Sequence, residues 1–97
     1  MLIGCTLSSA DLAAQAGRWQ ELIARAMTER SETTDGLRMS FRPDPGVESE
    51  LRTLAAAENE CCRWAAWAVE ANAEATVLDV SSTGPGVAAL HGMLRPA

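Results

Sequence analysis

A carboxylate in an apolar helical stripe, beside two adjacent cysteines, most constrains how this chain can fold. Residues 58–67 read Glu-Asn-Glu-Cys-Cys-Arg-Trp-Ala-Ala-Trp and mark the point where a helical pattern gives way to a strand pattern. Residues three and four apart share one face of a helix, so Glu58 is expected beside both Cys61 and Cys62. Burying a charge costs several kcal/mol unless the charge is paired or ligated, so this carboxylate needs a partner. The stripe continues upstream through Leu51, Leu54 and Ala55.

The composition predicts a single small domain over residues 1–97. With 47% hydrophobic residues, the chain can bury one modest core. The net charge of −5 and the lack of a basic stripe argue against nucleic acid as the main partner. All 8 basic residues are arginines, which is typical of GC-rich bacterial genomes. Without an apolar run of about 18 residues or a signal-like start, we expect a cytoplasmic protein with no membrane partner.

Hydrophobic periodicity in the first half predicts strand, helix, strand. A strand is expected over Leu2–Leu7, followed by an amphipathic helix that begins near Ser9 and ends near Arg30. The polar segment Ser31–Gly36 is expected to be a loop. Alternation then predicts a half-buried strand over Leu37–Arg42.

The second half predicts helix, strand, strand, helix. The helix starts at Pro45, capped by the preceding aspartate, and ends near Arg63 or Ala66. Strands over Trp67–Ala71 and Thr76–Val80 are joined by a turn, and a short helix closes the chain. The predicted fold is α+β, in the order strand-helix-strand-helix-strand-strand-helix, with a small, mainly antiparallel sheet covered by helices.

The cysteines predict a soft-metal site. Three cysteines cannot form a complete set of internal disulfides. Neighbouring Cα atoms are about 3.8 Å apart, whereas a disulfide normally needs about 4.4–6.8 Å, so Cys61 and Cys62 are expected as free thiols. They would be the primary ligands, with Cys5 as a third thiolate and Glu58 as an oxygen ligand or a base. The chain lacks the Cys-x2–4-Cys spacing of structural zinc, so Cu(I), Zn(II), a heavy metal or a thiophilic metalloid would be held in a low-coordinate, sulfur-rich site.

Two other classes of function stay open at the level of sequence. A thiol-redox or thiol-transfer enzyme would use one cysteine of the pair as its nucleophile, although the Cys-x-x-Cys arrangement is missing. A dimeric interaction module would use the cysteines only for packing, because free cysteine is often a small buried hydrophobe. His91, the single histidine, is expected to have a structural role rather than to serve as a ligand.

The segment Glu58-x-x-Cys61-Cys62-x-Trp64 resembles one found in small actinobacterial proteins that carry Glu-x-x-Cys-Cys-Pro-Phe/Trp at the end of a helix. The resemblance extends to Arg18-Trp19 and to the strand after Gly36. Arg63 stands where those proteins usually have proline. The resemblance implies a role in metal or metalloid handling, because such proteins are loosely associated with genes of that kind.

Overall fold

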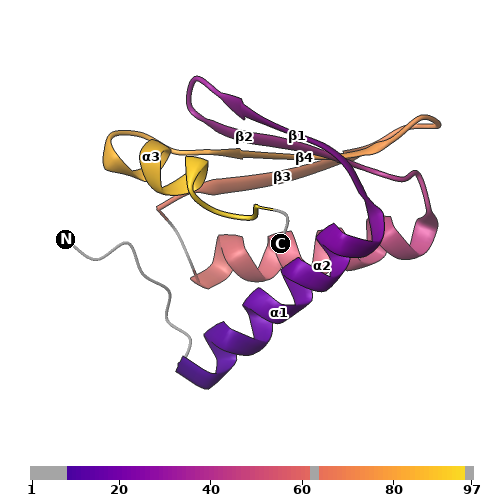
Figure 1. Ribbon diagram of the computed structural model, residues 1–97, viewed down its shortest axis with the longest axis horizontal. Helices are drawn as coiled ribbons and strands as arrows, with labels where there is room; N and C mark the ends of the chain where they lie inside the picture. Colours follow the sequence, from indigo (N-terminus) through magenta and orange to yellow (C-terminus); the bar gives the residue numbers. More distant parts are fainter. Residues whose placement is uncertain (1–8, 62–63, 96–97) are drawn as a thin grey trace.

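Two long helices run along one side of a four-stranded antiparallel sheet in the computed structural model, which describes residues 9–61 and 64–95 (Figure 1). The strands lie in the order β1-β2-β4-β3. The predicted fold class, α+β with a mainly antiparallel sheet covered by helices, is confirmed. Along the chain, the elements are α1 (Ser9–Ala26), β1 (Met27–Thr33), β2 (Gly36–Phe41), α2 (Pro45–Cys61), β3 (Ala66–Ala71), β4 (Thr76–Ser81) and α3 (Pro85–His91).

The order of elements differs from the prediction at one place. The first helix ends at Ala26 rather than near Arg30, and the segment expected to finish that helix and form a loop is strand β1. The described order is therefore helix-strand-strand-helix-strand-strand-helix. The strand predicted over Leu2–Leu7 lies outside the described residues.

Pairing with β2, rather than its own hydrophobicity, makes β1 a strand. β1 joins β2 through a two-residue turn that brings Thr33 opposite Gly36. The partly buried residues of β1 are Met27, Arg30 and Thr33, which fall three apart as in a helix. A bulge between Met27 and Glu29 contributes to this spacing, because an extra residue interrupts the alternation of a regular strand.

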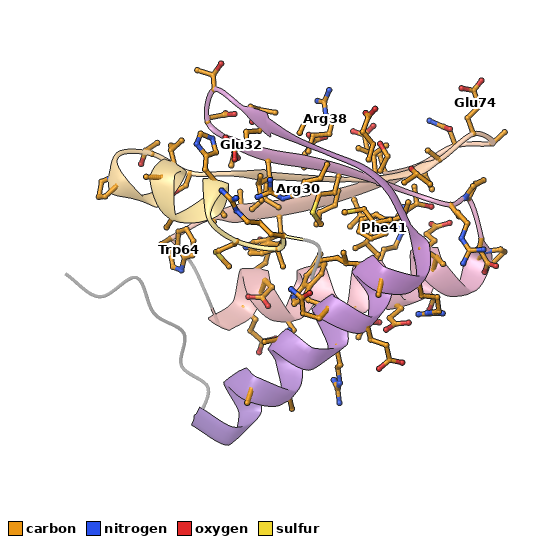
Figure 2. The ribbon with its side chains drawn as sticks, viewed as in Figure 1. Arg30, Glu32, Arg38, Phe41, Trp64 and Glu74 are labelled. Atoms are coloured by element: carbon orange, nitrogen blue, oxygen red, sulfur yellow. The ribbon has the colours of Figure 1, made fainter. Side chains whose placement is uncertain are left out.

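The second helix begins where its sequence predicts. The Asp44 carboxylate accepts a hydrogen bond of 2.8 Å from the Gly46 N–H, which caps α2 with Pro45 at its first position. Figure 2 shows Phe41 on the side of the sheet that faces the helices. The buried hydrophobic core consists of Trp19, Leu22, Ile23, Ala26, Leu37, Met39, Phe41, Val47, Leu51, Leu54, Ala55, Ala65, Trp67, Leu78, Val80 and Leu90.

The opposite face of the sheet carries mainly small and polar side chains. Arg38 and Asp79 are cross-strand neighbours there and form an ion pair with an Nε–Oδ1 distance of 2.7 Å. The hydrogen bond to Asp79 raises the pKa of Arg38 above its ordinary value. Ala68 lies beside Asp79 on the next strand. This face is thus solvated, and the hydrophobic core lies on the helix side only.

The predicted turn between the last two strands is present. The Asn72 side-chain oxygen accepts hydrogen bonds from the backbone N–H groups of Glu74, at 2.8 Å, and Ala75, at 3.0 Å. This local bonding is the reason asparagine favours turns. It fixes the register in which β3 returns as β4.

A substitution at Gly36 tests how closely β2 packs against β4. A Cβ at Gly36 would overlap the Val80 carbonyl oxygen, whereas a Cβ at Gly17 in α1 would meet no atom within 4 Å. We expect Gly36→Ala to lower the free energy of unfolding by about 3 kcal/mol, since the backbone of β4 would have to move. Gly17→Ala is the matched control and should raise it by about 0.5–1 kcal/mol. Urea denaturation of both variants measures the difference, and equal stabilities would contradict the close approach.

Candidate functional site

Glu58 is a buried carboxylate held by the neighbouring helix. It lies in the last turn of α2 and is only 7% exposed. Its Oε2 atom accepts a hydrogen bond of 2.9 Å from the indole Nε1–H of Trp19 and one of 3.2 Å from the amide Nε2–H of Gln15. Both donors come from α1. The Glu58 carboxylate therefore has two neutral donors from α1, and its expected contact with Cys61 and Cys62 lies outside the described side chains.

Two tryptophan rings adjoin this carboxylate cluster. The rings of Trp19 and Trp67 are tilted by 34° with their centroids 5.4 Å apart, a separation at which aromatic pairs attract. Trp67 Nε1 is buried and has no hydrogen-bond partner in the described part of the chain. The tryptophans thus connect the donor side of the cluster on α1 to β3.

Asn59 fastens the same helical turn to the sheet. Its Nδ2–H donates to the Trp67 carbonyl oxygen at 2.7 Å, and its Oδ1 accepts from the Trp67 backbone N–H at 2.9 Å. One side-chain amide thereby satisfies both backbone groups of an edge-strand residue, as a neighbouring strand would. Glu58 and Asn59 consequently bind the end of α2 to α1 on one side and to β3 on the other.

The chain is also fixed immediately after residues 62–63. The Ser82 hydroxyl donates a hydrogen bond to the Trp64 carbonyl oxygen, and Ala65 is buried. Trp64 packs partly buried against the core. The segment containing the cysteine pair is therefore held at Glu58 and Asn59 before it and at Trp64 and Ala65 after it.

The predicted ligands are described only in part. α2 ends at Cys61, whose side chain lies outside the described parts, as do Cys62 and Cys5. Among residues 9–61 and 64–95, no three His, Cys, Asp or Glu side chains are grouped so that they could hold a metal ion. Glu58 is the one predicted site residue whose surroundings are visible, and it is buried in the predicted apolar stripe with Leu51, Leu54 and Ala55.

Sequence reasoning missed Gln15 and Asn59. The spacing of Leu12, Ala16 and Trp19 predicts that Ala16 lies on the buried face of the first helix, yet Ala16 is exposed and Gln15 is buried instead. The apolar pattern could not reveal this, because the helix turns Gln15 inward to reach a carboxylate 43 residues away. No local signal marks Asn59 either, since its partner lies on the following strand.

His91 contacts the end of β1. Its Nε2 lies 2.9 Å from the Thr33 carbonyl oxygen, so α3 is bonded to the end of β1. Its Nδ1 lies 3.9 Å from a carboxylate oxygen of Glu32. Both groups belong to the contact between α3 and β1.

Comparisons with protein-family models, curated proteins and solved structures find no match to this chain. Within the described ranges, none of the helices combines the length and the apolar character needed to cross a membrane.

Replacing Glu58 tests whether the cluster stabilises the fold. Glu58→Leu would leave the Trp19 and Gln15 donors buried without an acceptor, so we expect a loss of about 2 kcal/mol in the free energy of unfolding. Glu58→Gln retains a side-chain oxygen and should cost less than about 1 kcal/mol. Thermal and urea denaturation, followed by tryptophan fluorescence, measures both. A Glu58→Leu variant as stable as the wild type would show that the two hydrogen bonds contribute nothing.

Replacing Asn59 tests the attachment of α2 to β3. Asn59→Ala removes two hydrogen bonds to Trp67, and we expect a loss of about 1–2 kcal/mol. Amide hydrogen exchange at Trp67 should accelerate more than exchange at residues of β2, because the lost acceptor protects that N–H directly. Ser49→Ala, at an exposed position of α2, is the control and should leave the exchange at Trp67 unchanged.

Proposed function

We propose that this protein binds a soft metal or metalloid ion through the thiolates of Cys61 and Cys62, with Cys5 as a third sulfur ligand. Cu(I), Zn(II) and As(III) are the ions whose chemistry suits such ligands. The role would be sequestration, delivery or sensing in the cytoplasm, without catalytic turnover. The observation that carries the proposal is the buried, anchored Glu58 one helical turn before the cysteine pair.

The end of α2 is a favourable place for a cation. The carbonyl end of a helix carries a partial negative charge, and the last turn of α2 contains no basic residue. Glu58 adds a formal negative charge to the same turn. A bound cation would offset both and would supply the positive charge that favours thiolate over thiol.

The same electrostatics weigh against the thiol-redox or thiol-transfer alternative. Reactive cysteines with a lowered pKa typically lie at helix N-termini or beside basic groups, whereas Cys61 is the last residue of its helix. Without an ion, the helix end and Glu58 would both disfavour a thiolate. Metal ligation is therefore the better use of this position.

Glu58 is better suited to positioning than to direct ligation. Its Oε2 already accepts two hydrogen bonds from α1, which fix the carboxylate. Groups that orient metal ligands and tune their basicity commonly occupy such held positions. In this proposal Glu58 serves as a base that takes up a thiol proton on binding and passes it to solvent, after which its carboxylate again supports the charge of the ion.

Anaerobic titration with Cu(I), Zn(II) and As(III) tests the proposal. We expect tight binding of at least one ion by the wild type and a loss of affinity of at least about tenfold, or 1.4 kcal/mol, in Cys61→Ser and in Cys62→Ser. Cys5→Ser should weaken binding if Cys5 is the third ligand. Met93→Leu is the control, because it removes a sulfur atom from the segment after α3 and should not change affinity.

Three outcomes separate the functional classes. Ion binding lost with either cysteine of the pair supports the metal site. Rapid alkylation of one thiol near neutral pH, without ion binding, would instead support the thiol enzyme. If Cys→Ala changes alter only the stability of the protein and no ion binds, the cysteines serve packing, and the interaction-module alternative holds.

A further inference from the structure

The two edges of the sheet differ in whether their backbone groups are covered. β1 and β3 are the edge strands. On β3, Asn59 bonds both backbone groups of Trp67, and Arg52 donates to the Val69 carbonyl oxygen at 3.2 Å. Side chains of α2 therefore occupy that edge. An uncovered edge strand, by contrast, is a template for pairing with another strand.

The pairing of β1 with β2 determines which of its backbone groups point outward. Thr33 faces Gly36 across the two-residue turn, and Ser31 faces Arg38. Both pairs are hydrogen-bonded positions of the hairpin. Backbone groups alternate in direction along a strand, and the Arg42 N–H, four residues after Arg38, points to the same side and donates to the Ala26 carbonyl oxygen at 3.0 Å. The intervening residues, Arg30 and Glu32, consequently direct their backbone N–H and C=O groups away from β2. Among the described residues, none donates to or accepts from these outward groups.

The side chains of Arg30 and Glu32 are themselves held in place. Figure 2 shows them on the side of the sheet occupied by α3. The Arg30 guanidinium donates to the carbonyl oxygens of His91, at 3.0 Å, and Met93, at 2.7 Å. An Arg30 nitrogen lies 3.7 Å from a Glu32 carboxylate oxygen. The Arg30 side chain is 13% exposed, whereas Glu32 is 45% exposed and also lies 3.8 Å from Arg95. The edge therefore carries a mostly covered basic residue and an exposed acidic residue two positions apart.

Charge selects one register for two copies of β1. An antiparallel pair can exchange backbone hydrogen bonds only where outward-facing residues oppose each other. A two-fold axis at Arg30 would set Arg30 against its own copy, and an axis at Glu32 would set Glu32 against its own copy. An axis at Ser31 sets Arg30 of each chain opposite Glu32 of the other, on the same face. Opposite charges in such cross-strand pairs stabilise a sheet, and like charges destabilise it.

We propose that β1 is the interface of a homodimer, in which the β1 strands of two copies pair antiparallel about Ser31 and join the two sheets into one. The occupant is a second copy of this chain because the edge is self-complementary in charge only in that two-fold register. The interface does not depend on the proposed metal site, because Asn59, in the helical turn before the cysteine pair, bonds to β3 at the other end of the strand order.

Sedimentation equilibrium of the wild type and of Glu32→Pro tests the interface. Proline at this position removes only an outward N–H, so the β1–β2 hairpin is retained while half of the intermolecular donors are lost. We expect the wild type to dimerise and Glu32→Pro to raise the dissociation constant at least about tenfold. Ala71→Pro is the matched control, because it removes an outward N–H from β3, and it should dimerise as the wild type does.

A charge variant keeps the proposal testable if Glu32→Pro does not fold. Glu32→Arg preserves the backbone donors and sets two guanidinium groups opposite each other, so it should also weaken the dimer. Circular dichroism establishes that each variant is folded. A wild type that stays monomeric at the highest soluble concentration would overturn the proposal and identify the charges of β1 as protection of a free edge. A dimer equally strong in folded Glu32→Pro or Glu32→Arg would overturn it as well.

Discussion

The packing of α1 against α2 depends on two hydrogen bonds that the Glu58 carboxylate accepts. A carboxylate 7% exposed would be strongly destabilising without donors, and Trp19 and Gln15 supply them from a different helix. The bonds therefore align α1 against α2 more specifically than apolar contact alone would. Neutral donors satisfy the oxygen but leave the negative charge uncompensated. This combination of an anchored carboxylate and the negative end of a helix dipole is the basis of the proposal that a cation binds at the end of α2.

The neighbouring residue extends that constraint from the helices to the sheet. Asn59 pairs with Trp67 as a strand would, and Trp67 packs against Trp19, the donor to Glu58. The result is a closed set of contacts from α1 through α2 to β3. It fixes the last turn of α2, which carries Glu58 and Asn59, against both α1 and β3. It also covers one edge of the sheet, so the two edges are left with different capacities for association.

The errors of sequence interpretation have identifiable physical causes. β1 lacks apolar alternation, because only pairing with β2 and the bulge near Thr28 define it, so a period-based argument assigned it to a helix and a loop. The turn residues are Thr34 and Asp35, which are not one of the Gly-containing pairs that mark a tight hairpin, so turn chemistry gave no strong signal either. The burial of Gln15 has no signal in the apolar pattern, because its partner Glu58 lies 43 residues away along the chain. The strand over Leu2–Leu7 and the three cysteine side chains stay predictions.

The sequence by itself determined the α+β class, the antiparallel hairpin turning at Asn72, the start of α2 at Pro45 and the unusual position of Glu58 on an apolar stripe. These features are local, because turn chemistry, capping and side-chain periodicity operate within a few residues. Only the tertiary structure decided which donors satisfy Glu58, how Asn59 closes the edge of β3 and why β1 is a strand. Those outcomes depend on groups brought together from distant parts of the chain, and hydrogen-bond partners of that kind leave no periodic trace in the sequence.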